Sequence, residues 1–132
     1  MENKFVKIID TLKSKIYFNY NVGKFTWFRT GGNAKIFVLV ENSEELEIIL
    51  NEIDNDNYYI MGSGSNLLIR DNGFNGTIIK LGKGFNSLNI VEDKLEVGAS
   101  VQDIILSNFA LRNSIKGFEF FSGIPGSIGG AV

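Results

Sequence analysis

A chain of 132 residues has the length of one domain, and its hydrophobic share of 44% and charged share of 21% are those of an ordinary globular protein. Its 13 basic and 15 acidic residues are interspersed, so the chain offers no basic surface for nucleic acid or an anionic membrane. The absence of cysteine and histidine excludes disulfides, thiolate nucleophiles, histidine-based triads and the usual zinc sites, so we expect no metal. No stretch has the pattern of a signal peptide or a bilayer-spanning segment, which predicts a cytoplasmic protein.

The first part of the chain predicts a helix, a strand and a second helix. Apolar residues at helical spacing predict an amphipathic N-terminal helix, namely Phe5, Ile8, Ile9, Leu12 and Ile16. The apolar run 34–40 follows the pair Gly31 and Gly32 and predicts a strand that is covered on both faces. Asn42 or Ser43 then caps a helix, whose buried side is expected to contain Leu46, Ile49, Leu50 and Ile53.

The middle of the chain predicts more strands. Short strands are expected at 58–61 and 77–81, and the strand–helix–strand order predicts parallel pairing. The segment 67–71 also has the composition of a short strand. After residue 84 the pattern alternates, which predicts an antiparallel hairpin with its apolar side facing inward, namely Leu88, Ile90, Leu95 and Val97.

The final helix is predicted from a possible capping box formed by Ser100 and Asp103, and it should end near Asn113. Its buried side is expected to contain Val101, Ile104, Ile105 and Phe109. The fold class is therefore α+β. We expect one domain, 1–132, with one small subdomain at about 20–84 and a second one from about residue 85.

The stretch MGSGSNLLIRDNGFNG at 61–76 places small polar residues among glycines directly after a predicted parallel strand. Without Cβ atoms in the way, successive backbone N–H groups can converge on an anion such as a pyrophosphate. The candidate donors are Gly62, Ser63, Gly64, Ser65 and Asn66. A P-loop needs a lysine here and a Rossmann loop needs a following helix, and this stretch has neither. A tight connection between strands therefore explains the composition at least as well.

The second candidate is SGIPGSIGGAV at 122–132, where Pro125 and several glycines suit backbone that lies flat against a planar ligand. A buried turn at a close crossing of two elements explains the same residues and is favoured by composition alone. Residues 29–32 form a weaker third candidate and more simply enter a strand. Asp71 and Glu119 are the carboxylates nearest these loops, but without histidine neither has an obvious partner for proton transfer.

Three segments together carry a resemblance to a known family. TGGNAKIFV, MGSGSNLLIRDNGFNGTIIKL and KGFEFFSGIPGSIGGAV resemble, in this order and spacing, the N-terminal part of the UDP-N-acetylenolpyruvoylglucosamine reductases, the MurB family. The resemblance runs from about residue 20 to the last residue. The pattern G-x-G-S-N-L-L-x-x-D at 62–71 followed by G-I-P-G-S-I-G-G-A at 123–131 makes it specific.

The resemblance implies the FAD-binding fold of the p-cresol methylhydroxylase and vanillyl-alcohol oxidase type, in which two α+β subdomains hold the flavin. It implies that the backbone amides of 62–66 wrap the FAD pyrophosphate. It also implies a set of residues along the ribityl chain and flavin ring, namely Ile124, Pro125, Gly126, Ser127, Ile128, Gly129 and Gly130. Fixed backbone amides that donate hydrogen bonds to a flavin tune the electronic properties of its ring.

The reaction implied by the resemblance belongs to peptidoglycan precursor synthesis, in which NADPH reduces FAD and the flavin reduces UDP-GlcNAc-enolpyruvate to UDP-N-acetylmuramate. The family's substrate-acting serine, glutamate and arginine lie downstream of the GGA segment, so no catalytic residue is carried over. We expect this chain to lack the substrate-binding domain and to be inactive alone. Two alternatives stay open: another flavin oxidoreductase of the same fold, and a non-catalytic or remnant nucleotide-binding module.

Overall fold

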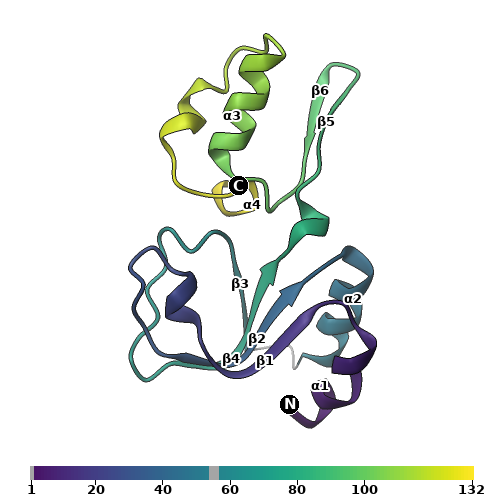
Figure 1. Cartoon of the computed structure of the whole chain (residues 1–132), viewed down its shortest axis with the longest axis vertical. Helices are drawn as coiled ribbons and strands as arrows, with labels where there is room; N and C mark the ends of the chain where they lie inside the picture. Colours follow the sequence, from purple (N-terminus) through teal and green to yellow (C-terminus); the bar gives the residue numbers. More distant parts are fainter. Residues whose placement is uncertain (1, 54–56) are drawn as a thin grey trace.

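The computed structural model describes residues 2–53 and 57–132, which form a lower and an upper part joined by a short connection (Figure 1). The lower part, here termed the sheet lobe, comprises residues 2–81 and contains a four-stranded sheet. The upper part, here termed the hairpin lobe, comprises residues 88–132 and contains a two-stranded hairpin and α3. The chain passes between them through the short 3-10 turn η3 (Lys83–Phe85).

The sheet has the strand order β1-β2-β4-β3. Its strands are β1 (Lys15–Asn21), β2 (Asn33–Val40), β3 (Tyr58–Met61) and β4 (Phe74–Leu81). β1 is antiparallel to β2, whereas β2 and β3 are both parallel to β4. The predicted parallel arrangement across α2 (Ser43–Glu52) is therefore confirmed, with β4 inserted between the two strands that α2 connects.

The N-terminal helix is shorter than predicted. α1 spans Glu2–Ile8, the 3-10 turn η1 spans Ile9–Thr11, and Ile16 is a buried residue of β1 and not of a helix. The physical reason is that two effects favour an extended chain after residue 12 over a longer helix. The backbone N–H groups of Lys13 and Ser14 donate to the Glu45 carboxylate at 3.0 and 2.7 Å, and the aromatic-rich stretch that follows favours a strand.

Both faces of the sheet are covered, as predicted for β2. On one face a buried cluster includes Ile36, Val38 and Val40 of β2 with Ile49 of α2, and on the other face Phe37 packs with residues of the loops and of β4. Asn42 caps α2 by accepting a hydrogen bond from the Glu45 N–H at 2.9 Å, which confirms the predicted helix start. The expected burial of Leu50 is wrong, because this side chain is 38% exposed.

The predicted strand at 67–71 is wrong, since these residues form an irregular segment. Ile69 is buried in the second core cluster, and the carbonyl of Arg70 accepts hydrogen bonds from the N–H groups of Gly32 and Gly73. Gly73 has φ of +77°, a turn that favours glycine and leads directly into β4. β4 consequently begins at Phe74, three residues earlier than predicted.

The hairpin lobe confirms the predicted hairpin but not its burial. β5 (Leu88–Val91) and β6 (Lys94–Val97) pair antiparallel, yet Ile90 is 47% exposed and the other expected inward residues are half-buried. The remaining elements are α3 (Asp103–Arg112), the 3-10 turn η4 (Glu119–Gly123) and the single helical turn α4 (Ile128–Ala131). Within the described ranges no helix is long and apolar enough to cross a membrane.

Two predictions about α3 are wrong. Its first turn has no side-chain cap: Ser100 donates to the carbonyl of Gly82 at 3.0 Å, and Asp103 is completely buried. Its buried residues are Asp103, Leu106, Ser107 and Ala110, whereas Ile104 and Ile105 are exposed. α3 lies against η4, so its orientation is determined by the segment after it and could not be read from its own sequence.

Candidate functional site

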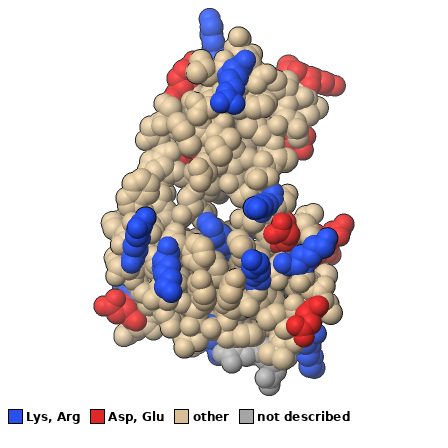
Figure 2. All heavy atoms as spheres, viewed as in Figure 1, with Lys and Arg blue, Asp and Glu red and all other residues tan. Residues whose placement is uncertain are grey.

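Three adjoining hollows lie between the lobes, where the space-filling view shows the molecule deeply indented (Figure 2). The central hollow has a volume of about 440 Å³ and is lined by most of the residues predicted from sequence, namely Gly62, Ser63, Gly64, Ser65, Asn66, Ile124, Pro125, Gly126, Ser127 and Gly130. Gly129 lines a neighbouring hollow of about 630 Å³, and Ile128 lines none of the three. The fold thus brings the two glycine-rich segments together from opposite lobes.

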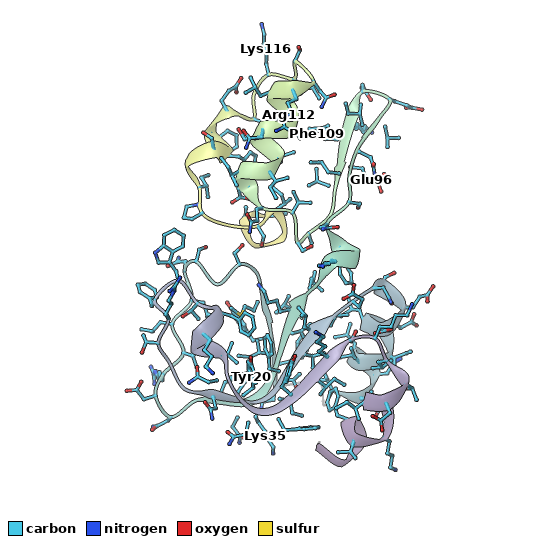
Figure 3. The ribbon with its side chains drawn as sticks, viewed as in Figure 1. Tyr20, Lys35, Glu96, Phe109, Arg112 and Lys116 are labelled. Atoms are coloured by element: carbon cyan, nitrogen blue, oxygen red, sulfur yellow. The ribbon has the colours of Figure 1, made fainter. Side chains whose placement is uncertain are left out.

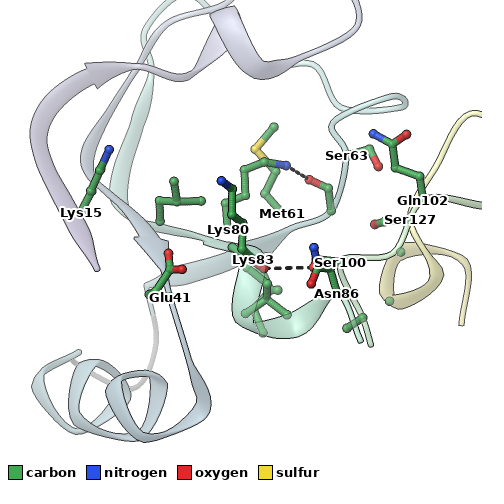
Figure 4. A pocket seen from close by; sticks show the side chains of 18 residues that line it. Lys15, Glu41, Met61, Ser63, Lys80, Lys83, Asn86, Ser100, Gln102 and Ser127 are labelled. Carbon is green, nitrogen blue, oxygen red and sulfur yellow. Dashed lines mark hydrogen bonds between the residues drawn. The ribbon is translucent and has the colours of Figure 1, made fainter. Parts of the chain in front are cut away.

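The loop 62–66 follows β3 at its carboxyl end and is held from two sides. The ammonium group of Lys80, in the neighbouring strand β4, donates to the carbonyl of Gly62 at 2.6 Å (Figure 4). On the other side, the N–H of Trp27 donates to the carbonyl of Gly64 at 2.9 Å. Both anchors use carbonyl groups of the loop and leave its N–H groups available.

Gly64 is a glycine because the fold requires it. Its φ is +75°, and an added Cβ would lie 2.5 Å from the carbonyl oxygen of Phe25 and 2.5 Å from the Met61 methyl group. The ring of Phe25 is in turn fixed by aromatic contacts, with centroids 5.0 Å from Phe37 and 6.0 Å from Tyr20, which is labelled in Figure 3. A side chain at position 64 would therefore disturb the loop itself as well as any ligand.

The amides of the loop have no hydrogen-bond partner within the part of the chain that the structure describes. None of the five backbone N–H groups of residues 62–66 donates a hydrogen bond to another group of the described residues. The N–H groups of Ile128 and Gly129, in contrast, donate to Val101 and Ala99 at 2.9 Å each. The backbone of 128–129 thus packs the hairpin lobe, whereas the loop 62–66, which lines the central hollow, has free N–H donors of the kind that an anion site requires.

The two glycine-rich segments approach each other closely at Gly62. A Cβ added there would lie 2.9 Å from Ser127 Oγ and 3.6 Å from Gly130 Cα. Ser127 itself is buried, at 5% exposure, and its carbonyl accepts from the N–H groups of Gly130 and Ala131 at 2.8 and 3.1 Å. The absence of side chains at 62 and 130 allows the two backbones to approach each other this closely.

A basic wall borders the hollow of about 630 Å³. Lys15, Lys80 and Lys83 line it together with the single carboxylate of Glu41 (Figure 4). Burial lowers the pKa of Lys80, and within the part of the chain that the structure describes no carboxylate pairs with its ammonium group. Sequence reasoning missed Lys80, because only the pairing of β3 with β4 places it beside the loop. Its charge favours an anionic ligand.

The opposite hollow, of about 800 Å³, is more aromatic. Trp27 is 66% exposed and lines it together with Phe25, Arg29 and the segment around Pro125. Of the third candidate, residues 29–32, only Arg29 lines the cleft, while Gly31 and Gly32 pack against the backbone of 69–73. Of the two carboxylates considered from sequence, Glu119 accepts from the Gly117 N–H at 2.9 Å and Asp71 is exposed. Neither lines the three hollows.

Asp103 is the acidic residue of the central hollow. Its side chain is fully buried, and neither carboxylate oxygen has a hydrogen-bond partner among the described residues. Burial raises the pKa of this carboxyl group. A Cβ on Gly126 would lie 2.5 Å from Asp103 Oδ2, so the glycine leaves room for the carboxylate. Its spacing from Ser100 resembles a helix cap, which is why sequence reasoning gave it no place in the site.

These features fit a nucleotide with a pyrophosphate. Residues whose backbone N–H groups have no partner among the described residues line the central hollow. Lysines line one end of the cleft, and an exposed tryptophan lines the other. An unpartnered buried carboxylate adds a hydrogen-bond acceptor for hydroxyl groups. Fold and cleft together are those of a nucleotide-binding α+β protein, with a candidate ligand site between two parts of one chain.

Comparison with known sequences identifies the family. The FAD binding domain family matches residues 34–132, and the chain belongs to this family. The fold class inferred from the sequence is thereby confirmed, and FAD is the cofactor. The backbone N–H groups of the loop 62–66 fit the pyrophosphate of FAD, because no group of the described residues uses them as donors.

Individual relatives confirm the resemblance to the MurB family. The chain is 43% identical over 130 residues to the UDP-N-acetylenolpyruvoylglucosamine reductase of Rickettsia typhi and 41% identical over 128 residues to that of Pelagibacter ubique. These matches cover 96% of this chain but only 43% and 42% of the relatives. The crystal structure of the reductase (MurB) from Thermus caldophilus superposes with a TM-score of 0.71 at 29% identity, over 91% of this chain and 41% of that one. The chain thus spans less than half the length of these reductases.

Proposed function

We propose that this chain is the FAD-binding portion of an NADPH-dependent reductase that converts UDP-GlcNAc-enolpyruvate to UDP-N-acetylmuramate in peptidoglycan precursor synthesis. The observation that carries the proposal is the row of unpartnered amides at 62–66, which faces the second glycine-rich segment across the cleft. The names of the similar proteins supply the reaction and the UDP-sugar. NADPH as reductant and a cytoplasmic location belong to the same proposal.

In this proposal the amides of 62–66 bind the pyrophosphate, and Lys80 stabilises the loop while adding positive charge to the cleft. Residues 124–130 lie along the ribityl chain and ring, and five of them, 124–127 and Gly130, line the central hollow. When bound, FAD supplies hydride transfer. We assign no catalytic residue to this chain, and we place the boundary between its two subdomains near residues 84–85.

The test is a visible absorption spectrum and FAD titration of the purified chain, wild type against Gly62→Val. Wild type should bind FAD, and the valine, which fills the gap toward Ser127, should weaken binding by about tenfold or more. Leu111→Val places the same residue on an exposed position of α3 outside the cleft and should bind FAD like wild type. Far-UV circular dichroism checks that both variants fold.

Wild type that binds no FAD at saturating concentration would refute the proposal and favour a remnant module. Equal FAD affinity of wild type and Gly62→Val would refute the placement of the pyrophosphate. The chain alone should not oxidise NADPH in the presence of the enolpyruvyl substrate, and detection of such turnover would show that the reaction needs no residue beyond those present here.

A further inference from the structure

The buried carboxylates of the two lobes differ in their hydrogen bonding. Glu45 in the sheet lobe accepts from the N–H groups of Lys13 and Ser14 and from the Ser14 hydroxyl, at distances of 2.5 to 3.0 Å. Asp103 in the hairpin lobe is 0% exposed and accepts from no group of the described residues. A buried carboxylate without donors is destabilising, and native proteins rarely keep one without a use. Its partner must come from outside the described residues.

The position of Asp103 restricts what that partner is. It lines the central hollow with the loop 62–66 and the segment around Gly126. Its own N–H donates to the carbonyl of Gly126 at 3.2 Å, which fixes the carboxylate at the wall formed by that segment. Because Gly126 lacks a side chain, its backbone lies directly beside Oδ2, at a place where an added Cβ would be only 2.5 Å from this oxygen. The carboxylate is therefore held beside the space between the two glycine-rich segments.

The chemistry of the site excludes two kinds of partner. A phosphate would be repelled by the negative charge of Asp103, and the free amides of 62–66 already offer a better place for it. A metal ion would need further acidic or histidine ligands, and the described residues contain no cluster of three or more such groups. A hydroxyl group fits, because it donates a hydrogen bond and carries no charge. FAD has such hydroxyls on both sides of its pyrophosphate.

We propose that Asp103 accepts hydrogen bonds from hydroxyl groups of the sugar chain of FAD and positions that chain relative to the pyrophosphate. The inference rests on the proposed function. Asp103 is a positioning residue. It fixes the position of the flavin nucleotide along the cleft, while the loop 62–66 binds the negatively charged pyrophosphate. The hydroxyls belong either to the ribityl chain or to the adenosine ribose, and both have the same donor chemistry.

The test measures the FAD dissociation constants of wild type, Asp103→Asn and Asp103→Leu by flavin fluorescence. The uncharged amide oxygen of Asn accepts a weaker hydrogen bond, so affinity should fall about threefold to tenfold, and the loss with Leu should be about tenfold to a hundredfold. Lumiflavin, which has the ring without the sugar chain, should bind all three proteins equally. FMN and ADP then separate the sources: the ligand whose affinity falls carries the hydroxyl that Asp103 contacts.

Each result decides the proposal. FAD affinity unchanged in Asp103→Asn overturns it, and this nearly isosteric variant serves alone if Asp103→Leu does not fold. Equal losses for lumiflavin and FAD also overturn it, because they would indicate a general disturbance of the cleft. Wild type that binds no FAD refutes the proposed function itself, whereas FAD binding that is insensitive to position 103 refutes only the role of Asp103.

Discussion

The sheet lobe and the hairpin lobe differ greatly in how many apolar side chains they bury. The sheet lobe contains both clusters of buried apolar residues, one on each face of β2. In the hairpin lobe, large apolar side chains remain exposed on the hairpin, on α3 and on η4, namely Ile90, Val91, Ile104, Ile105, Leu111 and Phe120. Phe109, on the side of α3 toward the hairpin, is only half-buried (Figure 3). The cleft thus lies between the well-packed sheet lobe, which contains the loop 62–66, and the hairpin lobe, which has only a small hydrophobic core.

The largest expected effect compares the same substitution in both lobes. Ile79→Ala removes a fully buried side chain of β4 and should lower the free energy of unfolding by about 3 kcal/mol. Ile105→Ala removes a side chain that is 50% exposed on α3 and should change it by less than about 0.5 kcal/mol. Urea unfolding measures both. Similar losses in the two variants would contradict the difference in packing.

A smaller effect is expected at the buried carboxylate of the sheet lobe. Burial favours the neutral form of Glu45, but hydrogen bonds from Ser14, Lys13 and Asn42 outweigh it and lower its pKa below 4.5. Its stabilising contribution is therefore present above the unfolded pKa and is lost as the pH falls through the lower, folded pKa. Glu45→Gln should lose about 2 kcal/mol at pH 7, and the difference from wild type should shrink in acid.

The control for that variant is Glu47→Gln on the exposed side of α2, which should match wild type at every pH. Thermal unfolding between pH 3 and pH 7 is the measurement. A loss in Glu45→Gln that does not change with pH would show that packing, and not the charge, is responsible.

The smallest effect has the opposite sign and lies in the hairpin lobe. Burial raises the pKa of Asp103 above 3.8, so the folded state holds its proton more tightly than the unfolded state. The contribution of the protonated carboxyl group to the free energy of unfolding is fully present below the unfolded pKa and is lost as the pH rises through the folded pKa. In the absence of FAD, Asp103→Asn should therefore stabilise the protein by about 1 kcal/mol at pH 7 and by less at pH 4. A destabilised variant at pH 7 would mean that the carboxylate has a partner in the free protein.

The local sequence predicted much of this molecule because several features depend only on neighbouring residues. The cap at Asn42, the two-sided burial of β2 and the hairpin are of this kind. The features that escaped prediction depend on distant residues. Glu45 ends the N-terminal helical region from a position 31 residues away, and Lys80 reaches the loop only because β4 lies beside β3. Asp103 has the spacing of a cap, and only its burial reveals another role.

The unpartnered N–H groups of the loop 62–66 have a consequence for sequence variation. In a site formed by backbone N–H groups, the positions of the donors depend on the conformation of the backbone. A change of side chain that preserves this conformation therefore preserves the anion-binding groups. Gly64 is restricted by φ of +75° and by Phe25, and Gly62 by Ser127, whereas the half-buried side chain of Ser63 makes no hydrogen bond among the described residues. Substitution of Ser63, the variable position of the G-x-G-S-N pattern, should therefore leave the affinity for a pyrophosphate nearly unchanged.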